Sequence, residues 1–287
     1  MDLLLNAIVA GVLVGGFYAA LALGVTVAFG MLDIVNIAHP GFIMLGAFLA
    51  YLGWSSFGVD PLLSALILLP IGFGIGCAFY RFYYLAFERR GEESLQGLAF
   101  FFGCLFIIEV GLLLVFGVDY RQVSAPYIGP VLEAGPVSMP WRTIIPFLGG
   151  LVMVAGMQLF LKRTYTGRVI MAVSQDVEAV RLIGANPVRI KEIAFGLSIA
   201  TGMVAGVLLI MIQPVEPSIG RDFIGRTFAI TVLGGMKSVW GTLAGGIILG
   251  VVEALTATYY GPSLAPAVAF GVLLVALTFR PEGLFRQ

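Results

Sequence analysis

Charged residues are scarce in this chain of 287 residues. Asp, Glu, Lys and Arg together make up 11% of it, whereas a soluble domain has about 25%. The mean hydropathy is +1.03, so water cannot be the solvent for most of the surface. The 16 basic and 16 acidic residues cancel, which leaves no excess positive charge for binding nucleic acid. The composition therefore indicates a protein that lies in a lipid bilayer.

Residues that carry chemistry are also few. The chain has one histidine and two cysteines, and Cys77 and Cys104 lie in apolar runs without the spacing of metal ligands. No Ser/His/Asp or Cys/His arrangement supports an intramembrane hydrolase. Residues 234–238 have a methionine between glycine and lysine, so they do not form a P-loop for ATP. We therefore predict a chain that is not an enzyme and holds no metal or cofactor of its own.

Long runs without charge dominate what is present. Five long segments without Asp, Glu, Lys or Arg are Leu3–Leu32, Leu62–Tyr80, Thr143–Leu161, Ile193–Val215 and Ala254–Phe279. About 20 apolar residues suffice for a helix to cross the hydrocarbon core. The runs are continuous, unlike the alternating segments of about ten residues that build membrane β-barrels. The sequence therefore predicts an all-α membrane protein, a polytopic helical bundle forming one transmembrane domain over residues 1–287.

We expect about eight full spans plus a short broken helix. The spans are expected near 4–30, 38–53, 61–87, 95–117, 142–161, 193–214, 240–259 and 263–279. The stretch 225–236 is about eleven residues, too short to cross alone. Small residues spaced by four, such as Gly11/Gly15 and Gly246/Gly250, let helix backbones approach closely in lipid. We expect them to serve packing within the bundle, with a subunit interface as the alternative.

The orientation follows from basic residues in short loops. Arg89-Arg90 and the polar insert 162–192 both follow odd-numbered spans, so both are expected in the cytoplasm. The N-terminus and the extracytoplasmic loop 118–141 then lie outside. The basic C-terminus reaches the cytoplasm only if 225–236 counts as a crossing. We interpret that stretch as a short, broken crossing.

The insert 162–192 is the sizeable charged segment between two apolar runs, and it holds six of the 16 basic residues. A short helix near its centre is expected to end at Gly184, before Asn186-Pro187. A membrane subunit driven by an external motor needs such a helix at its surface. We expect Glu178 and Arg181 to anchor it, with Val177, Val180 and Ile183 packed into a cleft of the motor. The coupling residues are Gln175, Asp176, Val177, Glu178, Ala179, Val180, Arg181, Leu182, Ile183 and Gly184.

Two broken segments, near 31–41 and 225–240, are candidates for the solute path. Broken helices at membrane depth are tolerated only where they are buried or line a cavity. The alternative is that Asn36 and His39 merely cap the helix that starts at Pro40. The path candidates are Asn36, His39, Gly41, Gly234, Gly235 and Glu253.

Acids within apolar runs are expensive and are functional candidates by default. Glu109 and Glu253 are such acids, and each is either a proton-coupling group or a hydrogen-bonded structural acid. Arg221-Asp222 and Arg226 flank the short helix, and we expect them outside the membrane, where they could dock an extracytoplasmic partner.

The segments Leu21–Thr26, Phe29–Gly41 and Met44–Phe48, together with Thr227–Glu253, closely resemble the LivH-type permease of branched-chain amino acid ABC importers. The resemblance covers essentially the whole chain. Glu178-Ala179, four residues and Gly184 look like a degenerate form of the importers' coupling motif, in which Val180 replaces the usual second alanine.

The resemblance implies a bundle of the ribose-type permease architecture in a bacterial inner membrane. It implies a second, related permease subunit, two cytoplasmic ATPase subunits that bind ATP and Mg, and a periplasmic solute-binding protein. The solute would be a branched-chain or related amino acid, or alternatively urea, a short amide or a carboxylate. An ion-coupled secondary transporter using Glu109 or Glu253 is the rival from another class.

Overall fold

The computed structural model describes residues 2–91, 95–135, 137–182, 184–280 and 283–284. Seven helices within these ranges are long and apolar enough to cross a membrane. They are α1 (Asp2–Val25) with its π-helical continuation η1 (Thr26–Met31), α2 (His39–Phe57), α3 (Pro61–Ala86), α4 (Leu95–Phe116), α5 (Trp141–Arg163), α8 (Pro187–Ile212) and α10 (Val239–Tyr259). The prediction of a polytopic all-α membrane protein is confirmed.

The remaining elements are shorter. They are η2 (Glu88–Arg90), α6 (Tyr165–Val173), α7 (Val177–Leu182), η3 (Pro217–Arg221), α9 (Asp222–Gly234), α11 (Ala265–Phe279) and an antiparallel hairpin of β1 (Val131–Ala134) and β2 (Val137–Pro140). The eighth expected span is α11, which has 15 residues. At 1.5 Å per residue it is about 22 Å long, shorter than the hydrocarbon core of about 30 Å. The hairpin was not predicted.

Local sequence signals set the helix boundaries. Asp60, Thr164, Asn186 and Ser238 stand just before α3, α6, α8 and α10, and each side chain accepts a hydrogen bond from a backbone N–H of the first turn. These are the preferred residues for satisfying donors at a helix start. α2 ends at Gly58, whose φ of +64° is the left-handed conformation that glycine adopts without strain.

α1 lies in the centre of the bundle and packs most extensively against α10. The backbones meet at glycines: a Cβ added to Gly246 would come 2.6 Å from the carbonyl oxygen of Gly15, and one on Gly250 2.5 Å from that of Gly11. In lipid no hydrophobic force drives helices together, so close backbone contact supplies the attraction. The glycine spacing therefore serves packing inside this subunit, as expected.

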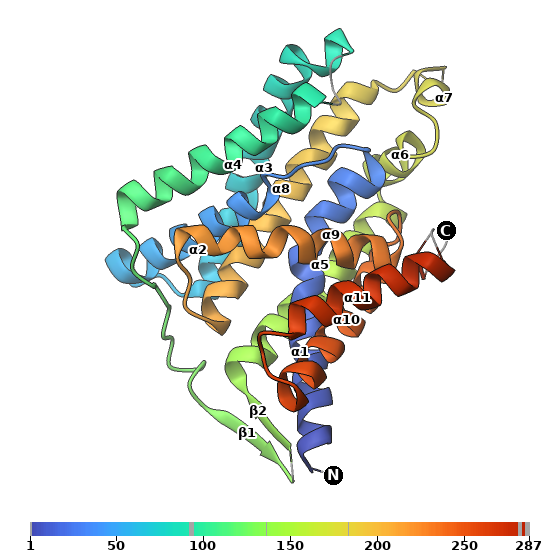
Figure 1. Cartoon of the computed structure of the whole chain (residues 1–287). Coiled ribbons are helices and arrows are strands. Elements are labelled where there is room, and N and C mark those ends of the chain that lie inside the picture. Colours follow the sequence, from blue (N-terminus) through green and yellow to red (C-terminus); the bar gives the residue numbers. More distant parts are fainter. Residues whose placement is uncertain (1, 92–94, 136, 183, 281–282, 285–287) are drawn as a thin grey trace.

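The bundle has two distinct ends (Figure 1). At one, which we call the insert end, are α6, α7 and the η2 turn. At the other, the hairpin end, are the N-terminus of α1 and the β1–β2 hairpin, where Ser138 donates its backbone N–H to Asn6 Oδ1 at 3.0 Å. Lys191 of α8 forms a 2.6 Å ion pair with Glu88 of η2. Arg89-Arg90 and the insert thus share one end, as predicted.

The chain between α8 and α10 re-enters the bundle. After α8 ends at the hairpin end, η3 packs against the start of α2: a Cβ on Gly220 would lie 2.8 Å from Met44 Cγ. α9 then runs across the middle of the bundle to the insert end (Figure 1). There Leu284 donates its backbone N–H to the Leu233 carbonyl at 2.9 Å. The last described residues therefore lie at the insert end, and η3 with α9 provides the short, broken crossing that was predicted.

Candidate functional site

The insert folds as two short helices joined by a tight turn. Asp176 begins α7 because its Oδ1 accepts the backbone N–H groups of Glu178 and Ala179 at 2.8 and 3.0 Å. After α7, Gly184 has a φ of +80°, and a Cβ there would meet no atom within 4 Å. Glycine is therefore needed at this position for its backbone conformation rather than for space.

The buried face of α7 rests on its own chain. Val180 is 2% exposed and packs with Val169 and Val173 of α6, with Val177 partly buried beside them. The expectation that Val180 fills a partner's cleft is therefore corrected, since this side chain is already enclosed. Ile183 lies outside the described residues. The apolar side chain that α7 does present is that of Leu182, which is 88% exposed.

The polar face of α7 carries an exposed ion pair. Arg181 donates to Glu178 Oε1 at 2.6 Å, three residues earlier on the helix. Such a surface pair contributes little to stability. It does place a guanidinium and a carboxylate beside Leu182 on the outward face.

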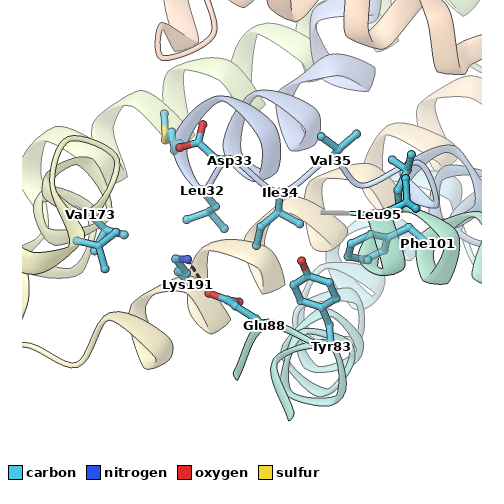
Figure 2. A pocket seen from close by; sticks show the side chains of 14 residues that line it. Leu32, Asp33, Ile34, Val35, Tyr83, Glu88, Leu95, Phe101, Val173 and Lys191 are labelled. Atoms are coloured by element: carbon cyan, nitrogen blue, oxygen red, sulfur yellow. Dashed lines mark hydrogen bonds and ion pairs between the residues drawn. The ribbon is translucent and has the colours of Figure 1, made fainter. Parts of the chain in front are cut away.

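A cavity of about 650 Å³ lies behind α7, between the insert, the segment that follows η1 and the α3–α4 turn (Figure 2). Leu32, Ile34 and Phe101 form much of its apolar wall, and the Lys191–Glu88 ion pair closes one side (Figure 2). A second hollow of about 420 Å³ shares Glu88, Val177 and Lys191 and extends to Arg181. The insert therefore stands over open space, which leaves it room to shift against the bundle.

One hydrogen bond joins the insert to the loop between α9 and α10. Lys237 Nζ donates to the backbone carbonyl of Ser174 at 2.6 Å. Ser174 is the C-cap of α6, so the ammonium meets the negative end of a helix, where carbonyls lack partners. The adjacent Met236 backbone contacts Gly30 of η1. The loop 235–238 thus contacts the insert and the end of the first span together.

All six path candidates are buried. His39 is 0% exposed and lies between Gly24 of α1 and Gly202 of α8, with its Nε2 3.1 Å from the Leu21 carbonyl oxygen. Gly41 packs against α4, and Gly234 packs against Gly241. Besides Glu253, the buried candidates are Asn36, His39, Gly41, Gly234 and Gly235.

Neither Asn36 nor His39 caps α2. The N-cap of α2 is Ala38, without a side-chain hydrogen bond. The amide atoms of Asn36 are buried without a hydrogen-bond partner among the described residues. The capping alternative is therefore wrong.

The sixth candidate, Glu253, belongs to a charge network that spans three helices. Its carboxylate accepts a hydrogen bond from Tyr18 of α1 at 2.7 Å and one from Arg226 Nε of α9 at 3.0 Å. Its side chain is 9% exposed, and that of Arg226 is 22% exposed. The acid is therefore hydrogen-bonded and ion-paired, as the structural alternative expected.

Glu109 is paired in the same way. Arg221 donates its Nε and one terminal nitrogen to the two oxygens of Glu109 at 2.8 and 2.6 Å, and its guanidinium lies 4.9 Å from the centre of the Phe106 ring. Arg221 and Arg226 were expected outside the membrane, but they are the partners of the two intramembrane acids. Isolated opposite charges in apolar segments were the sequence signal for this pairing.

A threonine cluster holds the re-entrant helix to the first span. Thr26 Oγ1 lies 2.7 Å from Thr242 Oγ1 and 3.2 Å from Thr231 Oγ1, which joins η1, α10 and α9. Thr26 is in the π-helical segment, and π-helical turns are frequent at functional positions. The cluster was not anticipated from the sequence.

Comparison with known proteins agrees with this architecture. Residues 7–277 match a family described as branched-chain amino acid transport system / permease component. The high-affinity branched-chain amino acid transport system permease protein BraD of Pseudomonas aeruginosa is 29% identical, over 98% of this chain and 95% of the relative. No solved structure shows a significant match to the chain.

Two further relatives carry related names. The corresponding permease protein LivH of Escherichia coli is 27% identical, over 96% of this chain and 92% of its own length. The permease protein LivM of the same bacterium is 26% identical, over 93% of this chain and 67% of its own length. The family match covers nearly every described element, from α1 to α11. The chain is a multi-pass membrane protein that belongs to the family of permease components of branched-chain amino acid transport systems.

Proposed function

We propose that this chain is one of two related permease subunits of an ABC importer that moves branched-chain or related amino acids into the cytoplasm. Two ATPase subunits, which bind ATP and Mg, drive it from the insert end, and a periplasmic binding protein delivers the solute at the hairpin end. The names of the relatives support the solute class. The similarity to both LivH and LivM supports a pair of unlike permeases in a bacterial inner membrane.

The observation that carries the proposal is the form of the insert. α7 is fixed by the Asp176 cap and by Val180 in its small apolar cluster, and it presents Leu182 with 88% of that residue exposed. A large apolar side chain on a rigid, charged turn is the type of anchor that binds a pocket of a partner. A subunit that works without a motor does not need such a helix.

A route for movement leads from this helix to the spans. α7 follows α6 directly, the end of α6 binds Lys237, and Lys237 lies in the loop that joins α9 to α10. A shift of the insert would therefore pull on the junction of the two helices that carry Arg226 and Glu253. The hollows behind α7 give it space to move.

The charges in the spans argue against the ion-coupled rival. Glu109 and Glu253 each have an arginine partner. Neither is therefore an isolated carboxylate of the kind that binds a coupling ion. This supports a subunit that is driven by separate ATPase subunits over one that binds a coupling ion with its own acid.

The test is to purify the tagged chain from its native membrane in mild detergent and to identify the chains that accompany it. We expect two ATPase subunits and one related permease subunit to accompany each copy of this chain. A variant with residues 175–186 replaced by a Gly/Ser linker should keep the second permease and lose the ATPase. If the chain purifies alone, or if the linker variant retains the ATPase, the proposed docking is contradicted.

A further inference from the structure

Charged side chains gather within the bundle around the start of α9. Arg226 and Asp222 lie on α9, and Glu253 lies on α10 six residues before its end at Tyr259. The segment just before α9 packs on the first turns of α2 at Met44, and α2 starts where His39 meets Leu21 near the end of α1. Glu253 accepts a hydrogen bond from Tyr18 within α1. This cluster therefore lies within the depth of the spans and not in an outer loop.

The cluster has one more negative than positive charge. Arg226 uses its Nε to bind Glu253, and that pair is neutral. Asp222 lies one turn earlier on the same face of α9, close enough for its charge to attract that of Arg226. Asp222 is exposed, and it forms no ion pair with any residue that the structure describes. The carboxylate of Asp222 is therefore left without an ion-pair partner among the described residues.

This face cannot lie against acyl chains. Exposed charges at membrane depth are costly in lipid and face the bundle interior, a partner or a water-filled cavity. Asp222 and the half-exposed side chain of Arg221 are both turned outward from this subunit. The face formed by η3 and the first turns of α9 must therefore look onto a polar space, and a second permease subunit can enclose that space.

The side chains suit a solute with two opposite charges. The guanidinium of Arg226 is flanked by the rings of Tyr18 and Phe223, at 5.9 and 5.7 Å from their centres. These rings fix its position and reduce its contact with water, which strengthens an ionic contact. Residues four apart on a helix have Cβ atoms about 5–6 Å apart, so a ligand whose two charges are on one carbon atom can meet both side chains.

We propose that Arg226 and Asp222 form a transit site for a zwitterionic α-amino acid, in which Arg226 binds the carboxylate and Asp222 the ammonium group. The inference rests on the proposed function and adds to it the residues that recognise the solute. Urea and short amides lack both charges, and a simple carboxylate lacks the ammonium. Such solutes would leave one or both side chains without a partner, and unpaired charges disfavour them.

The test uses the complete importer in proteoliposomes with enclosed ATP and saturating loaded binding protein, and it measures the rate of amino acid uptake. Asp222→Asn removes the free charge and keeps the shape, and we expect uptake to fall about tenfold, the factor that one lost charged contact of about 1.4 kcal/mol produces. Asp222→Glu should restore at least half of the rate. Glu216→Gln is the matched control, because Glu216 is a partly exposed acid just before η3 that accepts a hydrogen bond from Ser218, and uptake should stay within twofold.

A second variant guards against a purely structural effect. Arg226→Gln with Glu253→Gln replaces the ion pair by a neutral hydrogen-bonded pair, so the melting temperature should be retained while uptake falls at least tenfold. Equal uptake by Asp222→Asn and Glu216→Gln would overturn the transit site, as would full uptake by the double variant. If the wild-type importer shows no ATP-dependent uptake at all, the proposed function itself has failed.

Discussion

Leu182 is 88% exposed at the end of α7, so its side chain contributes little to the fold of this chain. If α7 docks into a cleft of an ATPase subunit, that side chain becomes buried. Burying a leucine side chain is worth about 1.5–3 kcal/mol, and about 2 kcal/mol corresponds to a factor of about 30 in affinity. We therefore expect Leu182→Ala to weaken ATPase binding about 30-fold and to leave the stability of the chain unchanged.

The assay titrates the permease pair, held in lipid nanodiscs, with purified ATPase subunit. It measures the dissociation constant by surface plasmon resonance or fluorescence. The matched control is Val180→Ala, two residues earlier on the same helix. Val180 is buried against Val169 and Val173, and losing its two methyl groups should cost the fold about 2 kcal/mol. The melting temperature should therefore fall for Val180→Ala and stay constant for Leu182→Ala.

The result that would refute this reasoning is specific. If Leu182→Ala binds the ATPase within twofold of the wild type, the exposed side chain is not buried in the complex. α7 would then not dock through its apolar tip. A fall in melting temperature for Leu182→Ala would show that the side chain belongs to the fold, contrary to its exposure.

Two further predictions concern the link between the loop 235–238 and the insert, and the packing of the spans. Lys237→Met removes the hydrogen bond to the Ser174 carbonyl, and we expect the amount of solute moved per ATP hydrolysed to fall at least threefold. Lys237→Arg, which can still donate this hydrogen bond, should keep the wild-type ratio. An unchanged ratio in Lys237→Met would exclude coupling through this hydrogen bond. Gly246→Ala forces a Cβ to within 2.6 Å of the α1 backbone and should destabilise by about 1–3 kcal/mol. Gly103 lies on α4, and a Cβ added there meets no atom within 4 Å, so Gly103→Ala should instead stabilise the protein by about 0.5–1 kcal/mol. Thermal unfolding in detergent measures both variants. Equal shifts of the melting temperature would contradict the close packing of α1 on α10.

Patterns of composition and spacing were sufficient to predict most of the architecture. Charge-free runs identified most of the spans because a helix that crosses lipid needs about 20 predominantly apolar residues. The four-residue glycine spacing predicted close packing within the bundle, and the structure shows such packing between α1 and α10. The basic loops and the short apolar stretch at 225–236 together predicted a broken crossing, and η3 with α9 forms it.

The site was less accessible from the sequence, and the reason is geometric. Arg221 pairs with Glu109 and Arg226 pairs with Glu253, and in each pair the partner lies on another helix and more than 25 residues away. One sequence gives a helix without its rotational setting, so these pairs could not be assigned. For the same reason Val180 was expected on the outer face of α7, although it faces inward.

The capping alternative for the segment after the first span was wrong for a related reason. Asn36 and His39 are polar residues close to Pro40, which made a helix cap a reasonable expectation. The structure instead buries His39 between Gly24 and Gly202. A contact between three helices cannot be read from the residues of one of them.

The most direct measurement is solute accumulation in vesicles with and without the ATPase subunits. Vesicles that contain the permease pair, the ATPases, enclosed ATP and external loaded binding protein should accumulate the amino acid against its gradient, and omission of either ATP or the ATPases should abolish accumulation. Accumulation by the permease alone under a proton or sodium gradient would contradict the claim that this chain is moved by motors bound at its insert end.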